Sequence, residues 1–139
     1  MASIAPNIFN VMWLFNKYNK MCFGGMLPRP RISLFHNKNI LGRFTCDFDE
    51  NDDMSNPSIE ISDSWEYTQE RLSDIIVHEM IHYYLAYEKI DVYLTHGKHF
   101  ISMANDFNSR FGLNITERID VNGMNKVKRG GWFSKLFGK

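Results

Sequence analysis

The chain has 139 residues, with 16 basic and 16 acidic side chains and a formal net charge of zero. This length fits one domain that buries roughly 68–70% of the surface of its unfolded chain. The balanced charge gives no reason to expect a polyanionic partner for the chain as a whole. The two cysteines, Cys22 and Cys46, form no Cys-x-x-Cys pair, which excludes a disulfide scaffold and a cysteine zinc ribbon.

The start of the chain and its apolar stretches indicate where in the cell the protein is located. Residues 1–7 have neither the cationic start nor the apolar run of a signal peptide, and no apolar stretch is long enough to span a bilayer. With so few cysteines, we expect a reducing setting and a cytoplasmic location.

The first element predicted along the chain is an amphipathic helix. Apolar residues from Asn7 to Cys22 recur at helical spacing, with Asn7 as the predicted N-cap and Gly24-Gly25 as the predicted end. Pro28 and Pro30 then favour extended backbone.

Three short segments have the composition or alternation of strands, namely residues 31–36, 43–48 and 58–62. We expect them to form a small three-stranded antiparallel sheet. Five acidic side chains between Asp47 and Asp53 are typical of a solvated loop between strands rather than of a metal or partner site.

His78, Glu79 and His82 form an H-E-x-x-H sequence in a predicted helix that Thr68 caps. Residues four apart on a helix lie one above the other, so both imidazoles can chelate one metal ion. Glu79 is rotated by about 100° from His78, so it is no ligand and is free to transfer a proton. The helix is apolar around most of its circumference, which predicts a place in the middle of the domain.

A catalytic zinc site usually takes three protein ligands and leaves one position for water. Glu88 is six residues past His82, but Leu85 and Ala86 continue the helix, which carries Glu88 about 9 Å farther along the axis. We therefore exclude Glu88 as the third ligand.

Two other candidates for the third ligand, His96 and His99, follow a connector at residues 90–95 that lets the chain fold back. They open a further predicted helix that ends at Gly112. Spacing alone does not choose between the two histidines. One helix, a small sheet and two more helices make an α+β domain.

Several motifs together resemble the SprT-like zinc metallopeptidase family. They are Ile76-Val77-His78-Glu79-Met80-Ile81-His82, the H-G-x-x-F match His96-Gly97-Lys98-His99-Phe100, Asn114-Ile115-Thr116, and Phe23-Gly24-Gly25-Met26-Leu27 after the first helix. The resemblance extends over roughly residues 8–120. It implies a zincin-like metallopeptidase core within residues 1–122 that binds one Zn²⁺ ion, with His96 as the third ligand beside His78 and His82. His99 is then expected at the surface or in a substrate cleft, and His36 in a structural or exposed place.

The chemistry implied is hydrolysis of a peptide bond by a zinc-activated water, with Glu79 as the general base that later protonates the leaving amine. Candidate donors to the oxyanion are Tyr83, Tyr84 and Tyr93. Zinc proteases commonly bind substrate as an added strand at a sheet edge, and the strand at 58–62 is the expected edge. The substrate is a protein or peptide, and the family resemblance makes proteins crosslinked to DNA, and their repair, a plausible class.

The end of the chain, residues 123–139, is a basic and aromatic tail that we expect to be flexible. Basic residues interleaved with aromatic ones can bind single-stranded DNA, but also an anionic membrane or a protein groove. The chain has no cysteine beyond Cys46 and therefore lacks the cysteine zinc ribbon of many SprT-like proteins. An alternative function is a metal-stabilised nucleic-acid- or protein-binding module without catalysis, in which His99 would be a fourth ligand to a structural zinc ion.

Overall fold

The computed structural model describes residues 2–92 and 94–128, so Tyr93 and the tail from residue 129 onward lie outside the described residues. The elements, in chain order, are α1 (Ile8–Phe23), β1 (Arg31–Phe35), β2 (Gly42–Phe48), β3 (Met54–Ser62), α2 (Gln69–Tyr87) and α3 (Lys98–Phe111). This α+β composition confirms the expected fold class. None of the described helices is both long enough and apolar enough to cross a membrane.

The helix ends follow local sequence. Asn7 caps α1 through a reciprocal capping box with Asn10, and Thr68 caps α2 by accepting a hydrogen bond from the Arg71 N–H. Gly24 and Gly112 end α1 and α3 in the left-handed region, at φ values of 61° and 67°. A glycine adopts this conformation without the steric cost that a Cβ would bring, so these two positions stop the helices.

The expected antiparallel sheet is wrong in one of its two strand pairs. The strand order is β1-β3-β2, with β3 antiparallel to β2 and parallel to β1. After β1 the chain forms β2, which becomes an outer strand of the sheet. The turn at residues 49–53 then reverses the chain and places β3 between β1 and β2. β3 therefore runs in the same direction as β1. Alternation along a sequence indicates strands, but it does not determine their order.

The sheet order also corrects the expected substrate edge. Residues 58–62 belong to β3, which is hydrogen-bonded to a strand on either side, so its backbone offers no free edge. The two edges of the described sheet are β1 and β2.

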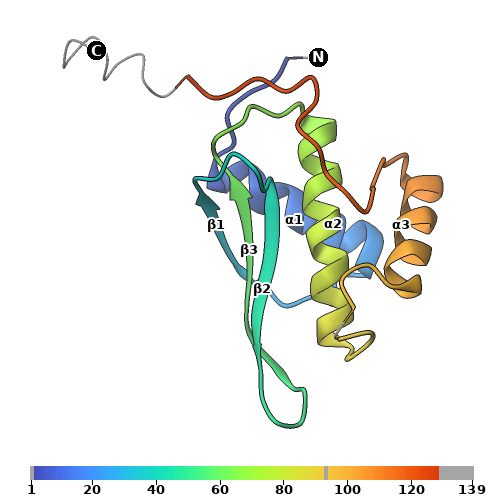
Figure 1. Cartoon of the computed structure of the whole chain (residues 1–139). Coiled ribbons are helices and arrows are strands. Elements are labelled where there is room, and N and C mark those ends of the chain that lie inside the picture. Colours follow the sequence, from blue (N-terminus) through green and yellow to red (C-terminus); the bar gives the residue numbers. More distant parts are fainter. Residues whose placement is uncertain (1, 93, 129–139) are drawn as a thin grey trace.

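α2 lies at the centre of the molecule, between the sheet and α3 (Figure 1). Its most deeply buried residues have exposed fractions of 0–1%, and they are Ile75, Ile76, Val77, Met80, Ile81 and Tyr83. Because α2 contacts α1, α3, β2 and β3, its apolar circumference is covered on all sides, as predicted. The two histidines and the glutamate of the H-E-x-x-H sequence are thus held on the most firmly packed element.

The segment after α3 returns along the domain. Backbone hydrogen bonds join Glu66 N–H to the Asn125 carbonyl and Val127 N–H to the Ser64 carbonyl. The described start of the predicted tail is therefore fixed against residues 64–66. The boundary at residue 122 stays a prediction.

Candidate metal centre

The three predicted ligands meet at one point. The Nε2 atom of His78 lies 3.2 Å from Nε2 of His82 and 3.3 Å from Nε2 of His96, and the ligand atoms of all three lie within 4.8 Å of one another. Two nitrogens that bind the same tetrahedral zinc ion at 2.0–2.1 Å are about 3.3–3.4 Å apart. The spacing of the rings therefore fits a single bound metal ion, and this group could hold one.

The protonation state of the rings also suits a metal. Burial lowers the pKa of His78 to about 4 and that of His82 to about 3, and it lowers the pKa of His96 as well. All three imidazoles are then neutral at pH 7. The neutral ring is the form that binds a metal, because a protonated ring has no free lone pair.

A backbone carbonyl orients His78. The Thr116 carbonyl accepts a hydrogen bond from Nδ1 of His78 at 2.8 Å, and since a carbonyl can only accept, Nδ1 carries the proton. Nε2 is left with its lone pair, which faces the other two histidines. Outer contacts of this kind fix the tautomer and orientation of metal-binding histidines.

The Thr116 carbonyl is held in place by the segment that follows α3. The Asn108 side chain bonds both backbone groups of Ile115, and the Asp74 carboxylate accepts from the Asn114 N–H at 2.9 Å. The hydrogen bond between the Thr116 carbonyl and His78 was not predicted from the sequence, because any residue can supply a carbonyl. The Asn114-Ile115-Thr116 motif marked the segment but not its role.

Phe100 forms an apolar base beneath the three imidazoles. Its ring is fully buried, and its centroid lies 4.7–4.8 Å from those of His78, His82 and His96. His96 directly precedes Gly97, the N-cap of α3, and Phe100 lies in the first turn of that helix, so the start of α3 brings both residues against α2. The ring limits how far any of the three imidazoles can rotate.

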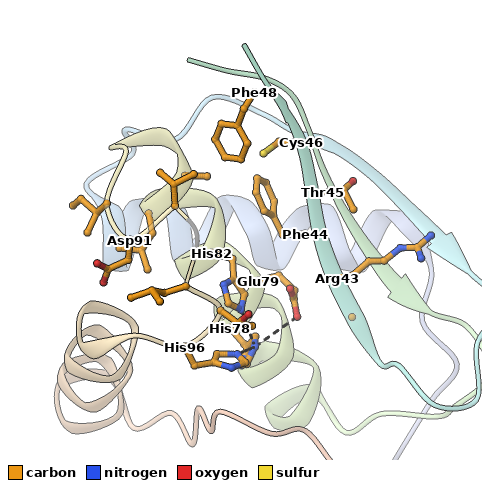
Figure 2. Close-up of a pocket in the computed structure, with 17 residues that line it drawn as sticks. Arg43, Phe44, Thr45, Cys46, Phe48, His78, Glu79, His82, Asp91 and His96 are labelled. Carbon is orange, nitrogen blue, oxygen red and sulfur yellow. Dashed lines mark hydrogen bonds and ion pairs between the residues drawn. The ribbon is translucent and has the colours of Figure 1, made fainter. Parts of the chain in front are cut away.

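Glu79 lies beside the histidines without joining them. Its side chain is buried, and its Oε2 atom is 4.0 Å from Nε2 of His78 (Figure 2). Burial raises the pKa of Glu79 to about 8, an effect that a backbone hydrogen bond from Phe44 partly offsets. A cation bound nearby would favour the ionised carboxylate and lower this pKa.

The start of β2 approaches Glu79 closely. A Cβ atom on Gly42 would lie 3.3 Å from Oε2 of Glu79 and only 2.9 Å from Cγ2 of Ile75. Glycine is therefore required for β2 to pack this close to α2, and the approach fixes the Glu79 side chain from the sheet side.

The other candidates lie elsewhere. Nδ1 of His99 is 2.7 Å from the Asp91 carboxylate, so this histidine does not join the group. Glu88 is exposed at the end of α2, in agreement with its exclusion as a ligand. His36 is exposed and contacts Ser64, as expected for a structural or exposed histidine.

The two candidate oxyanion donors that the structure describes, Tyr83 and Tyr84, are poorly placed to act on the metal site. The Tyr83 hydroxyl donates to the Pro28 carbonyl at 2.8 Å and is fully buried in the core. Tyr84 packs against Phe23, with 5.6 Å between the ring centroids. Neither lines the cleft that opens at the three histidines, which argues against both as oxyanion donors. Tyr93, the third candidate, lies outside the described residues.

The three histidines and Glu79 open into a cleft of about 510 Å³ (Figure 2). One wall is β2, and the other is the C-terminal end of α2 with the described residues of the connector, 90–92 and 94–96. His78, Glu79 and His82 are near one end of this cleft, below Phe44. A group bound in the cleft could reach the point where the three Nε2 atoms converge.

The fold and the site together define an α+β domain in which three histidines that could hold a metal ion lie beside a buried glutamate. The model of the SprT-like family matches residues 11–119, which is most of the chain. The protein belongs to the SprT-like family, and this membership is consistent with a metallopeptidase. No curated protein matches the chain.

Proposed function

We propose that the protein is a zinc-dependent endopeptidase. The observation that carries the proposal is the convergence of three neutral imidazoles on one point, with a buried, non-ligating carboxylate beside them and an open cleft above. Three histidines and an open position make the ligand set of a catalytic zinc ion, whereas structural zinc sites use four protein ligands.

Zinc, when bound, supplies a Lewis acid that polarises a carbonyl and lowers the pKa of a water molecule toward about 7. His78, His82 and His96 would hold it, with the ring of His78 oriented by Thr116. The Glu79 carboxylate takes the proton of the attacking water and passes it to the nitrogen of the leaving amine. Its burial beside Gly42 keeps the carboxylate in a fixed position for both transfers.

β2 replaces the 58–62 segment as the proposed substrate-binding edge. It is an edge strand of the described sheet and it forms one wall of the cleft. An extended peptide that pairs with this edge would be held by its main chain across the metal site. Binding of this kind does not depend on the sequence of the substrate.

We also propose proteins attached to DNA as substrates. The support is membership of the SprT-like family together with the basic residues that begin at Lys126. The aromatic part of the tail lies outside the described residues.

The alternative of a non-catalytic binding module needs a fourth protein ligand. The candidate for that ligand, His99, is bound to Asp91 instead, and the metal-binding group of the described residues contains three histidines. The structure therefore offers no support for the alternative.

One experiment tests the proposed function. We expect one zinc ion per chain by metal analysis, and cleavage of an unfolded DNA-binding protein that a chelator abolishes and added Zn²⁺ restores. Single-stranded DNA should increase the cleavage rate if the substrates are attached to DNA. Equal rates with and without DNA would contradict the DNA proposal alone, and full cleavage by the metal-free protein would contradict the peptidase proposal.

A further inference from the structure

Beside His78, Glu79 and His82, the cleft continues along an apolar lining. It lies between β2, from Phe44 to Phe48, and the connector that follows α2 (Figure 2). The apolar residues that line it are Phe44, Phe48, Leu85, Ile90, Val92 and Leu94. Phe48 and Leu94 keep exposed fractions of 41% and 60%, so they offer apolar surface that no described residue covers.

Besides Glu79, the ionisable Arg and Asp side chains that line the cleft, Arg43 and Asp91, are already paired. Arg43 binds Glu60 through two hydrogen bonds, at 2.8 Å and 3.2 Å. The Asp91 carboxylate lies 2.7 Å from Nδ1 of His99. Neither is therefore a free partner for a charged group that enters the cleft.

Cys46 contributes a small, neutral group to the same wall. Burial raises the pKa of its thiol, so the thiol stays protonated at pH 7 and behaves as a weakly polar side chain. A charged side chain in this part of the cleft would lose water without gaining a partner. A large apolar side chain would instead cover part of this lining and be removed from water itself.

We propose that this region, which we call the apolar end of the cleft and define by the six lining residues, selects substrates with a large apolar side chain close to the scissile bond. The inference rests on the proposed peptidase function and adds a side-chain preference to main-chain binding along β2. Phe48 on one wall and Leu94 on the other are the specificity-determining residues, because both are exposed to an incoming side chain.

The first test uses the parent protein, loaded with zinc, and a set of peptides that differ at one residue. Each residue near the cleaved bond is changed in turn to Leu, Phe, Asp or Lys. At the position that contacts the apolar end, we expect kcat/KM to be about 10- to 100-fold higher for Leu and Phe than for Asp and Lys, the effect of burying a large apolar side chain. The same kcat/KM for all four residues at every position would overturn the inference.

The second test changes the lining. Phe48→Lys should lower kcat/KM for the Leu peptide and raise it for the Asp peptide, because the new ammonium group supplies the missing partner. Phe9→Lys is the matched control, since Phe9 is on α1, is 82% exposed and does not line the cleft. Leu94→Ala, on the opposite wall, should reduce the preference for Leu without reversing it.

Binding measurements separate this inference from the proposed function. The zinc-loaded Glu79→Gln variant should bind the Leu peptide more tightly than the Asp peptide, as measured by calorimetry. If the parent cleaves none of the peptides, the peptidase proposal fails, and the binding of the two peptides still decides the inference. Equal affinity for both peptides would overturn it, whatever the parent cleaves.

Discussion

Replacing Glu79 with Gln is expected to lower kcat by about 10²- to 10⁴-fold while zinc stays bound, because an amide cannot accept the proton of the attacking water. The substitution keeps the size of the side chain, so the packing against Gly42 should persist. The measurements are the cleavage rate of an unfolded protein and the zinc content of the purified variant. The carboxylate is not a metal ligand in this account, so zinc content should equal that of the parent.

The matched control for this prediction is Glu88→Gln. Glu88 lies on the same helix but is exposed at its end, away from the histidines, so its substitution should leave cleavage unchanged. A Glu79→Gln variant that cleaves as fast as the parent would show that Glu79 is not the general base. A variant that loses its zinc would instead assign Glu79 to the metal.

Replacing His96 with Ala is expected to weaken zinc binding by more than about 100-fold, since the loss of a direct ligand should exceed the 10–100-fold cost of losing an outer contact. Two nitrogens on α2 would remain, at 3.2 Å from each other, and two ligands hold zinc poorly. Cleavage should fall with the metal. The measurement is a competition titration with a chelator of known zinc affinity.

His99→Ala is the matched control, three residues farther along. Nδ1 of His99 is paired with Asp91, so its removal should leave zinc affinity close to that of the parent. If His99→Ala loses zinc and His96→Ala keeps it, the third ligand has been assigned to the wrong histidine. Loss of zinc in both variants would indicate a site with four protein ligands.

Features that depend on local sequence could be predicted well. The N-caps at Asn7 and Thr68 and the glycine end at Gly112 agree with the structure, because each depends on a few neighbouring residues. The pairing of His78 with His82 was equally secure, since one helical turn determines it.

Features that depend on tertiary packing were harder to predict. Whether β3 would lie beside β1 could not be read from alternation, because the same pattern suits either order and either direction. Spacing alone did not separate His96 from His99, and the choice of His96 depended on the family resemblance. His96 precedes the α3 N-cap and faces α2, whereas His99 lies inside the first turn of α3 and pairs with Asp91.

Contacts made through the backbone left no trace in the residue pattern. The Thr116 carbonyl that orients His78 is the clearest case, because its position depends on the path of the chain after α3. Tyr83 is the reverse case, in which the sequence suggested a role that the structure does not support. Its place one residue after His82 suggested a role at the metal, but a residue rotated by about 100° from a ligand faces another side of the helix, here the core.

The proposed function depends on three imidazoles that hold one catalytic zinc ion and leave one of its positions free. Crystallography of the zinc-loaded protein, with anomalous diffraction measured at the zinc absorption edge, tests it most directly. We predict a single zinc peak about 2.0–2.1 Å from Nε2 of His78, His82 and His96, with a water molecule as the fourth ligand. A peak away from His96, or a fourth position filled by a protein side chain, would contradict it.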